Sequence, residues 1–215
     1  MTPRERTVVF VHGLWMTGHE SIFLRRELRR ELNAECAVFS YRSVVNDVTA
    51  NAAELAEFVR SFDTPRLDLV GHSLGGLVIL KCLEEHPQPP PGRVVLLGSP
   101  LQGSAVARAL SRFPLLKAML GRGIEQEAIP EAVRRWRGQR EVGVIAGSLS
   151  IGMGRLFAPL PVPNDGTVTV AETQLEGATG HVVLPVSHTG MVYSGLVAQQ
   201  AAHFLRTGRF DYVPD

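Results

Sequence analysis

The chain has 215 residues, of which 45% are hydrophobic and 20% are charged, and its formal net charge is +1. This composition is typical of a globular protein with a full hydrophobic core. The small net charge gives no indication of a nucleic-acid or polyanion partner. The sequence contains no evident signal peptide and no apolar run long enough to span a bilayer, so we expect a cytoplasmic protein. One domain is expected over residues 1–215.

Strand and helix patterns alternate along the chain, starting with a strand. Continuous apolar runs predict strands at 7–11, 37–39, 67–71, 94–97, 142–146 and 181–186, with a short extended piece at 168–170. Helical spacing of apolar residues predicts helices up to Leu32, from 48 to 62, directly after 71–76, and from 192 to 205. Such alternation predicts a three-layer α/β sandwich: a mostly parallel sheet of about six strands with helices on both faces.

The first helix carries a start signal of its own. Thr17 and Glu20 have the spacing of a capping box, and Leu24, Leu28 and Leu32 share one face of the helix that follows. The sequence therefore predicts a capping box formed by Thr17 and Glu20 at the start of this helix.

The two cysteines, Cys36 and Cys82, do not have the spacing of a metal site. Cys36 falls in a predicted strand and Cys82 in a predicted helix, so buried free thiols are a better interpretation than a disulfide. We expect no metal site.

Residues 71–76 read Gly-His-Ser-Leu-Gly-Gly between a predicted strand and a predicted helix. This Gly-x-Ser-x-Gly pattern is typical of a nucleophile elbow, a tight turn that raises a strained serine, here Ser73, above the sheet. Gly71 and Gly75 are expected because side chains there would collide with the neighbouring strand and helix. The alternatives are a plain glycine-rich turn or a phosphate-binding loop. A P-loop is excluded because the segment has no Gly-Lys-Ser/Thr.

A serine nucleophile needs a general base, and His188 follows the last predicted strand. Active sites of open parallel sheets lie at the carboxyl ends of the strands, so His188 is well placed to take the proton of Ser73. Alone, it would be interpreted as a structural histidine. The other histidines lie at worse positions for a base: His12, His19, His72, His86, His181 and His203.

Asp165 is the candidate acid, in the turn 163–167. A carboxylate there can accept a hydrogen bond from His188 Nδ1 and stabilise the imidazolium. Asn-Asp-Gly is also ordinary turn chemistry, which is the alternative interpretation. The chain order serine, aspartate, histidine favours the catalytic role. We expect the later carboxylates, Glu172 and Glu176, to face solvent.

An oxyanion hole is expected from two backbone N–H groups, those of Leu14 and Leu74. Leu74 follows directly from the elbow, and Leu14 ends the loop after the first strand. His12, at the start of that loop, is expected to tie loops together rather than act as a base.

Taken together, these segments resemble the α/β-hydrolase superfamily, and more narrowly compact bacterial lipases and related lipase-like deacylases. The resemblance spans residues 8–207 in outline and is concentrated in four segments: 9–14, 69–76, 98–104 and 187–194. It implies the small form of the fold and no cofactor. No acidic pair of the kind that binds calcium in some larger bacterial lipases is evident.

The substrate pocket is expected to involve two apolar regions. Residues 101–140 are the candidate helical cap or lid, and 151–161 form an apolar loop rich in glycine and proline. Core packing of a covering helix is an equally good interpretation of the apolar stretch 113–120. Residues of both regions are candidates for the pocket: Leu101, Phe113, Leu116 and Phe157.

The sequence therefore predicts a serine esterase or lipase that acts through an acyl-enzyme on a small-molecule or lipid ester, with transient contact to a lipid surface as an option. An acyltransferase, thioesterase or amidase could use the same triad. A non-catalytic binding protein on this fold is the alternative from a different class.

Overall fold

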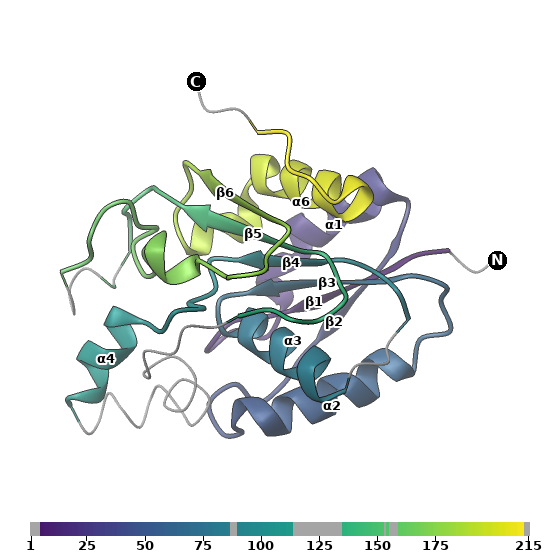
Figure 1. Cartoon of the computed structure of the whole chain (residues 1–215), viewed down its shortest axis with the longest axis horizontal. Coiled ribbons are helices and arrows are strands. Elements are labelled where there is room, and N and C mark those ends of the chain that lie inside the picture. Colours follow the sequence, from purple (N-terminus) through teal and green to yellow (C-terminus); the bar gives the residue numbers. More distant parts are fainter. Residues whose placement is uncertain (1–4, 87–89, 114–134, 153, 155–158, 213–215) are drawn as a thin grey trace.

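The computed structural model describes residues 5–86, 90–113, 135–152, 154 and 159–212 (Figure 1). Its strands form one sheet of six, in the order β2-β1-β3-β4-β5-β6, and every neighbouring pair is parallel. The predicted parallel α/β sheet is confirmed. The strands are β1 (Thr7–Val11), β2 (Glu35–Phe39), β3 (Leu67–His72), β4 (Val94–Leu97), β5 (Val142–Gly147) and β6 (Gly180–Leu184).

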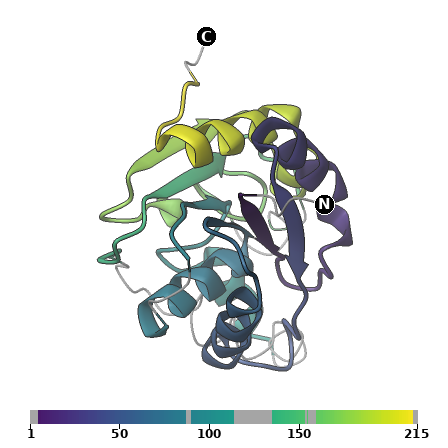
Figure 2. The same cartoon turned by 90° about the vertical axis from the view of Figure 1, so that its right-hand side faces the viewer.

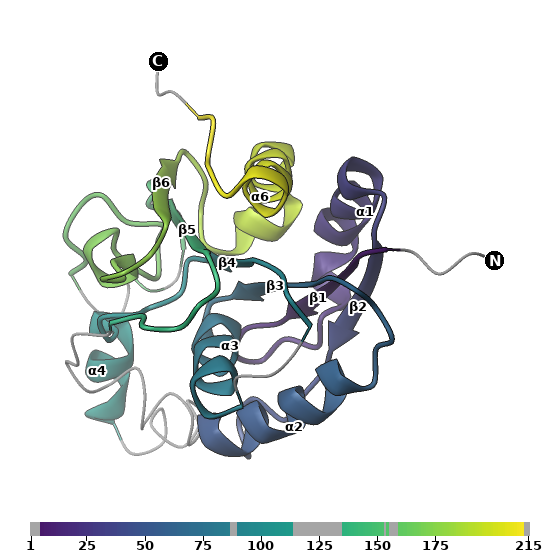
Figure 3. The same cartoon turned by 45° about the vertical axis from the view of Figure 1, so that its right-hand side comes forward.

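Helices cover both faces of this sheet, as predicted. In all three ribbon views α1 and α6 lie together on one face, and α2 and α3 lie on the other (Figures 1, 2 and 3). A short helix, α4, lies beyond one end of the sheet (Figure 1). The helices are α1 (Ile22–Leu32), α2 (Val48–Arg60), α3 (Leu74–Glu85), α4 (Ala105–Ser111) and α6 (Gly195–Thr207), and the 3-10 turns are η1 (His19–Ser21), η3 (Ala171–Thr173) and η4 (Thr189–Tyr193).

The strands build two cores because successive side chains point to opposite faces of the sheet. In β1, Val8 and Phe10 pack in the cluster under α1 and α6, whereas Val9 and Val11 pack in the cluster over α2 and α3. All four side chains have no exposed surface. A continuous apolar run is the sequence of a strand covered on both sides, which explains why these runs predict the sheet so well.

The start of the first helix differs from the prediction. Gly18 has a positive φ of 91° and breaks the helical path, so α1 begins at Ile22. The Glu20 carboxylate accepts a hydrogen bond from the Gly18 amide at 2.9 Å, and the Thr17 hydroxyl pairs with His19 Nδ1 at 3.0 Å. The predicted capping box is therefore wrong, because the glycine between its two members takes a conformation that a helix cannot include.

Two further segments differ in detail. Residues 168–170 form no strand: Thr169 makes one isolated bridge to Asn164 before η3 begins. The predicted helix 192–205 is divided into η4 and α6, and Ser194 caps α6 by accepting a hydrogen bond from the Val197 amide.

The two cysteines are free thiols. Neither Cys36 nor Cys82 forms a disulfide. Burial raises the pKa of the Cys82 thiol to about 12, which keeps it protonated and unreactive.

Within the described ranges, no helix has the length and apolar character needed to cross a membrane. The same ranges hold no group of three or more metal-ligating side chains.

Candidate active site

The turn between β3 and α3 holds Ser73 in a strained conformation. Its φ is 54° and its ψ is −121°, a region that residues other than glycine rarely adopt. The Ser73 amide donates a hydrogen bond to the Leu97 carbonyl at 2.8 Å, which fixes the turn to the end of β4. This geometry is that of a nucleophile elbow.

The glycines of the elbow are required by close backbone approaches. A Cβ at Gly75 would lie 2.2 Å from the Val11 carbonyl oxygen, and one at Gly71 would lie 2.7 Å from the Gly76 nitrogen. Both distances are impossible for a side chain, so the predicted reason for these glycines is confirmed.

Asp165 and His188 form a buried pair next to this turn. His188 Nδ1–H donates to Asp165 Oδ2 at 2.7 Å, and the His188 amide donates to the Asp165 carbonyl at 2.8 Å. The other carboxylate oxygen, Oδ1, accepts from the amides of Thr167 and Val168 at 2.9 and 2.7 Å. A proton on Nδ1 leaves the Nε2 lone pair of His188 available to accept a proton.

Gly98, at the end of β4, packs directly on this pair. It has a positive φ of 55°, and a Cβ there would lie 3.0 Å from His188 Nδ1 and 3.1 Å from Asp165 Oδ2. Since any side chain would press on the hydrogen bond between the two, a glycine is needed at this position.

The His72 side chain holds the backbone of His188, a contact that the sequence does not reveal. Its Nε2–H donates to the His188 carbonyl at 3.0 Å, and the two rings lie 4.9 Å apart. Burial, with a smaller effect of the neighbouring His188, lowers the pKa of His72 to about 3. His72 is therefore neutral at ordinary pH and holds the backbone of His188 without competing for its charge.

The loop after β1 is braced by residues that follow β2. His12 Nδ1–H donates to the Gly13 carbonyl at 2.8 Å, and its Nε2 accepts from the Tyr41 amide at 3.2 Å. Its ring also stacks on Tyr41 at 4.3 Å. The Trp15 amide donates to the Ser43 hydroxyl oxygen at 3.2 Å. His12 thus ties loops together, as expected.

The two amides predicted for an oxyanion hole flank the elbow. Leu14 follows the braced Gly13, and Leu74 is the first residue of α3, whose initial N–H groups have no partner within the helix. Among the described residues, neither the Leu14 nor the Leu74 N–H donates a hydrogen bond. Both are therefore available to a bound oxyanion.

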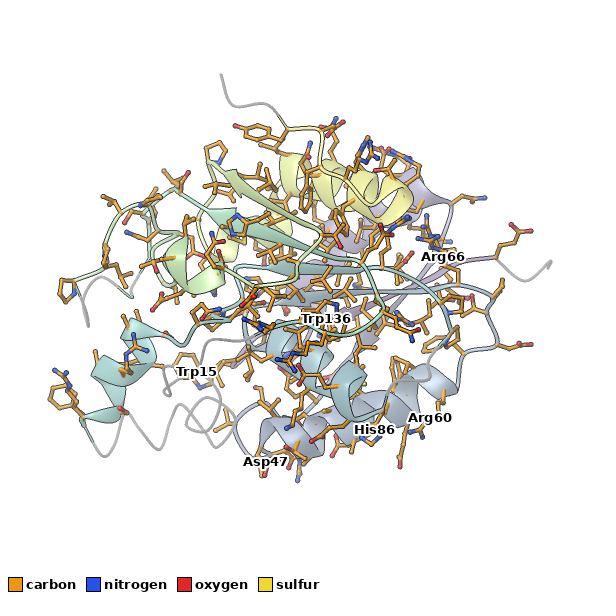
Figure 4. All side chains as sticks on the ribbon, in the orientation of Figure 1. Trp15, Asp47, Arg60, Arg66, His86 and Trp136 are labelled. Carbon is orange, nitrogen blue, oxygen red and sulfur yellow. The ribbon has the colours of Figure 1, made fainter. Side chains whose placement is uncertain are left out.

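These residues surround one cavity of about 240 Å³ at the carboxyl ends of the strands. Trp15, 59% exposed, lies toward α4 at its rim (Figure 4). No Asp, Glu, Lys or Arg is among the described lining residues, which are Gly13, Leu14, Trp15, Met16, His72, Ser73, Pro100, Ser104, Val106, Ala107, Leu110, Thr167, Val168, His188 and Thr189. The structure thus brings Ser73, His188 and Leu14 to one neutral cavity, with Asp165 directly behind His188.

The model of the alpha/beta hydrolase family matches residues 8–208 of the chain. The chain belongs to this family. No curated protein sequence matches it significantly.

Solved structures of similar fold include other alpha/beta hydrolases. The mature lipase BlEst2 from Bacillus licheniformis has a TM-score of 0.73 and 20% identity, covering 95% of this chain and 92% of that one. The metagenomic carboxyl esterase MGS0156 has a TM-score of 0.64 and 19% identity, covering 87% and 65%. YbtT, a type II thioesterase of the yersiniabactin pathway, has a TM-score of 0.59 and 18% identity, covering 96% and 92%. At these identities the likeness shows the shared fold alone.

The residues predicted for the substrate pocket of this alpha/beta hydrolase are placed elsewhere where the structure describes them. Leu101 is 2% exposed and packs in the core over α2 and α3, and Phe113 lies just past the end of α4 and is 60% exposed. Neither lines the cavity. Leu116 and Phe157 lie outside the described residues, as does 114–134 of the predicted cap. The apolar wall comes instead from α4, whose Val106, Ala107 and Leu110 face the cavity.

The prediction that Glu172 faces solvent is wrong. Its side chain is buried, and its two carboxylate oxygens accept hydrogen bonds from the amides of Ala105 and Thr169 at 2.5 and 2.8 Å. Glu176, by contrast, is exposed, as expected, and pairs with Arg135. Glu172 is buried because a remote backbone N–H group satisfies its charge, which no local pattern reveals.

A larger hollow, of about 960 Å³, lies by the amino ends of β4 and β5, away from Ser73. Its described lining contains no serine, cysteine or histidine, and consists of Leu83, Glu84, Pro91, Gly92, Arg135, Trp136, Arg137, Gly138, Gln139, Arg140 and Glu141. The described lining therefore lacks the pair of a serine or cysteine nucleophile and a histidine, which the smaller cavity has in Ser73 and His188, so the smaller cavity is the candidate active site.

Proposed function

We propose that the protein is a serine hydrolase that cleaves carboxylic esters through an acyl-enzyme. The observation that carries this proposal is the buried hydrogen bond between His188 Nδ1 and Asp165 Oδ2, beside a cavity that His188 shares with the strained Ser73. Family membership and the fold shared with a lipase and a carboxyl esterase support the same reaction class.

The reaction follows from the roles of these groups. Ser73 Oγ attacks the ester carbonyl while His188 Nε2 takes its proton, and Asp165 stabilises the imidazolium that forms. The amides of Leu14 and Leu74 bind the oxygen of the tetrahedral intermediate as it gains negative charge. His188 then protonates the leaving alcohol. In the second half of the reaction His188 takes a proton from water, which attacks the acyl-enzyme, and Ser73 Oγ leaves with a proton from His188.

The cavity favours an uncharged substrate of modest size. Its described lining carries no charged Asp, Glu, Lys or Arg side chain, so a charged acyl group would be desolvated without a partner. Its volume of about 240 Å³ lies below the usual range of pockets for drug-sized ligands. We therefore expect small-molecule esters with an apolar acyl chain.

The test is hydrolysis of p-nitrophenyl esters from acetate to laurate, with the Ser73→Ala variant as the blank. We expect the wild type to turn over esters and the variant to lose roughly 10⁵–10⁶-fold in kcat, as in other serine triads. A fluorophosphonate should label Ser73 in the wild type and fail to label the variant. Retained turnover in Ser73→Ala would remove the elbow serine from the mechanism.

A thioester is the second candidate substrate, because the fold is shared with the type II thioesterase YbtT. The same Ser73 acyl-enzyme would form from either substrate, so the two are separated by kcat/KM for oxygen esters and thioesters of one acyl group. If neither substrate is turned over and the fluorophosphonate does not react, a binding protein on this fold becomes the better interpretation.

A further inference from the structure

Glu172 is a buried carboxylate for which the proposed reaction has no use. It belongs to η3, and only 8% of its surface is exposed. A buried carboxylate is costly unless hydrogen bonds satisfy its charge. Its contacts therefore indicate what holds it there.

Those contacts join two segments that are far apart in the sequence. Glu172 Oε1 accepts from the amide of Ala105, the first residue of α4, and its backbone carbonyl accepts from the Gln102 amide at 2.9 Å. Oε2 accepts from the Thr169 amide in its own loop. Arg108 of α4 lies 3.9 Å from Oε1. The Glu172 carboxylate thus fixes the first residue of α4 to the loop that also carries Asp165, while backbone carbonyls of Glu172 and Gln174 hold Gln102 before the helix.

The position of α4 matters because this helix forms the apolar wall of the cavity. Val106, Ala107 and Leu110 line it, and Thr167 and Val168 of the tethered loop line it too. A helix of seven residues is too short to be stable by itself, so its position depends on such tethers. The distance between the two walls is therefore set where Glu172 joins them.

We propose that Glu172 is a specificity-determining positioning residue, which fixes α4 against the 165–172 loop and thereby sets the length of acyl chain that the cavity accepts. This proposal rests on the proposed function. Releasing α4 widens the cavity, so kcat/KM for esters with long acyl chains rises relative to kcat/KM for esters with short ones.

The first variant is Glu172→Gln. A glutamine amide has one acceptor oxygen for two backbone N–H groups, and its own NH₂ group opposes the second donor. Hydrogen bonds to a charged group are strong, so we expect the ratio of kcat/KM for the decanoyl to the butanoyl p-nitrophenyl ester to rise about tenfold. The matched control is Glu176→Gln, an exposed glutamate four residues along the same segment, which should leave the ratio unchanged.

The second variant, Ala105→Pro, removes the tether from the other side. Ala105 is the first residue of α4, where proline is favoured, and Ser104 before it has the extended conformation that precedes proline. The substitution removes the N–H group that donates a hydrogen bond to Glu172 Oε1, and it leaves the glutamate in place. Ala105→Pro should also raise the decanoyl-to-butanoyl ratio of kcat/KM. The double variant should raise this ratio little beyond either single variant, because both substitutions remove the same hydrogen bond.

A measurement without activity keeps the tether testable by itself. Hydrogen exchange of the α4 amides should become faster in Glu172→Gln and in Ala105→Pro, and stay at the wild-type rate in Glu176→Gln. Faster exchange in an inactive protein would support the tether while refuting the ester hydrolase. Unchanged exchange and an unchanged chain-length ratio in both variants, or equal losses for every acyl chain, would overturn the proposal.

Discussion

Asp165 and Glu172 are two buried carboxylates of one short loop, and they differ in which of their oxygens the backbone uses. In Asp165 both backbone amides bind Oδ1, so Oδ2 remains for His188. In Glu172 the two oxygens accept from two different segments, one from the amide of Ala105 and the other from the amide of Thr169. One carboxylate of the loop thus bonds a histidine, and the other joins two backbone segments.

The two proposals assign different functions to the two ends of the loop. In the proposed reaction the Asp165 end fixes the histidine that moves the proton, and in the proposal for Glu172 the other end fixes the helix that limits the acyl chain. The two ends should therefore respond to substitution in different measurements: the rate constant for one, the preference among substrates for the other.

The largest effect is expected at Asp165. In Asp165→Asn an amide replaces the acceptor of the His188 Nδ1 proton, so the wrong tautomer is favoured and the imidazolium loses its partner. We expect kcat to fall by roughly 10³–10⁴-fold, as for such substitutions in other triads, with little change in the decanoyl-to-butanoyl ratio. Steady-state kinetics on the same p-nitrophenyl esters measure both quantities.

Glu172→Gln is the control for this loss, since it removes a buried charge from the same loop without touching His188. Its decrease in kcat should be far smaller. A near-wild-type kcat in Asp165→Asn would mean that another carboxylate is the acid partner of His188. The proposed difference in function between Asp165 and Glu172 would then be wrong.

The sequence predicts the parts of this site that depend on local pattern. Ser73 stands in a glycine-rich turn between a strand and a helix, and His188 follows an apolar run, so their placement at the carboxyl ends of strands could be inferred. Asp165 could be proposed from chain order and turn chemistry. The four inner strands, β1, β3, β4 and β5, are buried along their whole length, and continuous apolar runs therefore mark them.

The sequence fails where the deciding partner is remote. Nothing around Glu172 indicates that the amide of Ala105, 67 positions earlier, satisfies its charge. His72 is visible as part of the elbow, but its bond to the His188 carbonyl spans 116 positions. The capping box fails for a local reason: Gly18 takes a positive φ that the spacing of Thr17 and Glu20 does not reveal.

A smaller effect is expected at Gly98, which touches the Asp165 end of the loop alone. In Gly98→Ala the residue must adopt a left-handed conformation, which costs about 1–2 kcal/mol, and its methyl group presses on the Asp165–His188 hydrogen bond. We expect lower stability in urea unfolding and a kcat lowered by about tenfold or more, as the distorted pair loses part of its strength.

Gly195→Ala is the matched control for this substitution. A Cβ at Gly195 would meet no atom within 4 Å, and the residue begins α6. We expect a change in stability below about 1 kcal/mol, in the stabilising direction, and an unchanged kcat. If the two alanine variants behave alike, crowding of the pair by Gly98 is not what excludes a side chain there.

The last effect concerns the pH dependence of stability and tests the support of His188 by His72. Because burial lowers the pKa of His72 from 6.5 to about 3, the unfolded chain binds this proton more readily than the folded one. The free energy of unfolding therefore has its full value above pH 6.5 and falls as the pH drops from 6.5 toward 3, by up to about 1.4 kcal/mol per pH unit for this group. Burial also lowers the pKa values of His12 and His181, which adds to the same trend.

His72→Gln should remove one group from that slope, since the glutamine amide can donate to the His188 carbonyl without titrating. Between pH 6.5 and pH 5, the free energy of unfolding of the variant, measured in urea, should fall by about 1.6 kcal/mol less than that of the wild type. His19→Gln, at an exposed position, is the matched control and should keep the wild-type slope. An equal slope in His72→Gln and the wild type would mean that His72 stays neutral in both states or is protonated in both.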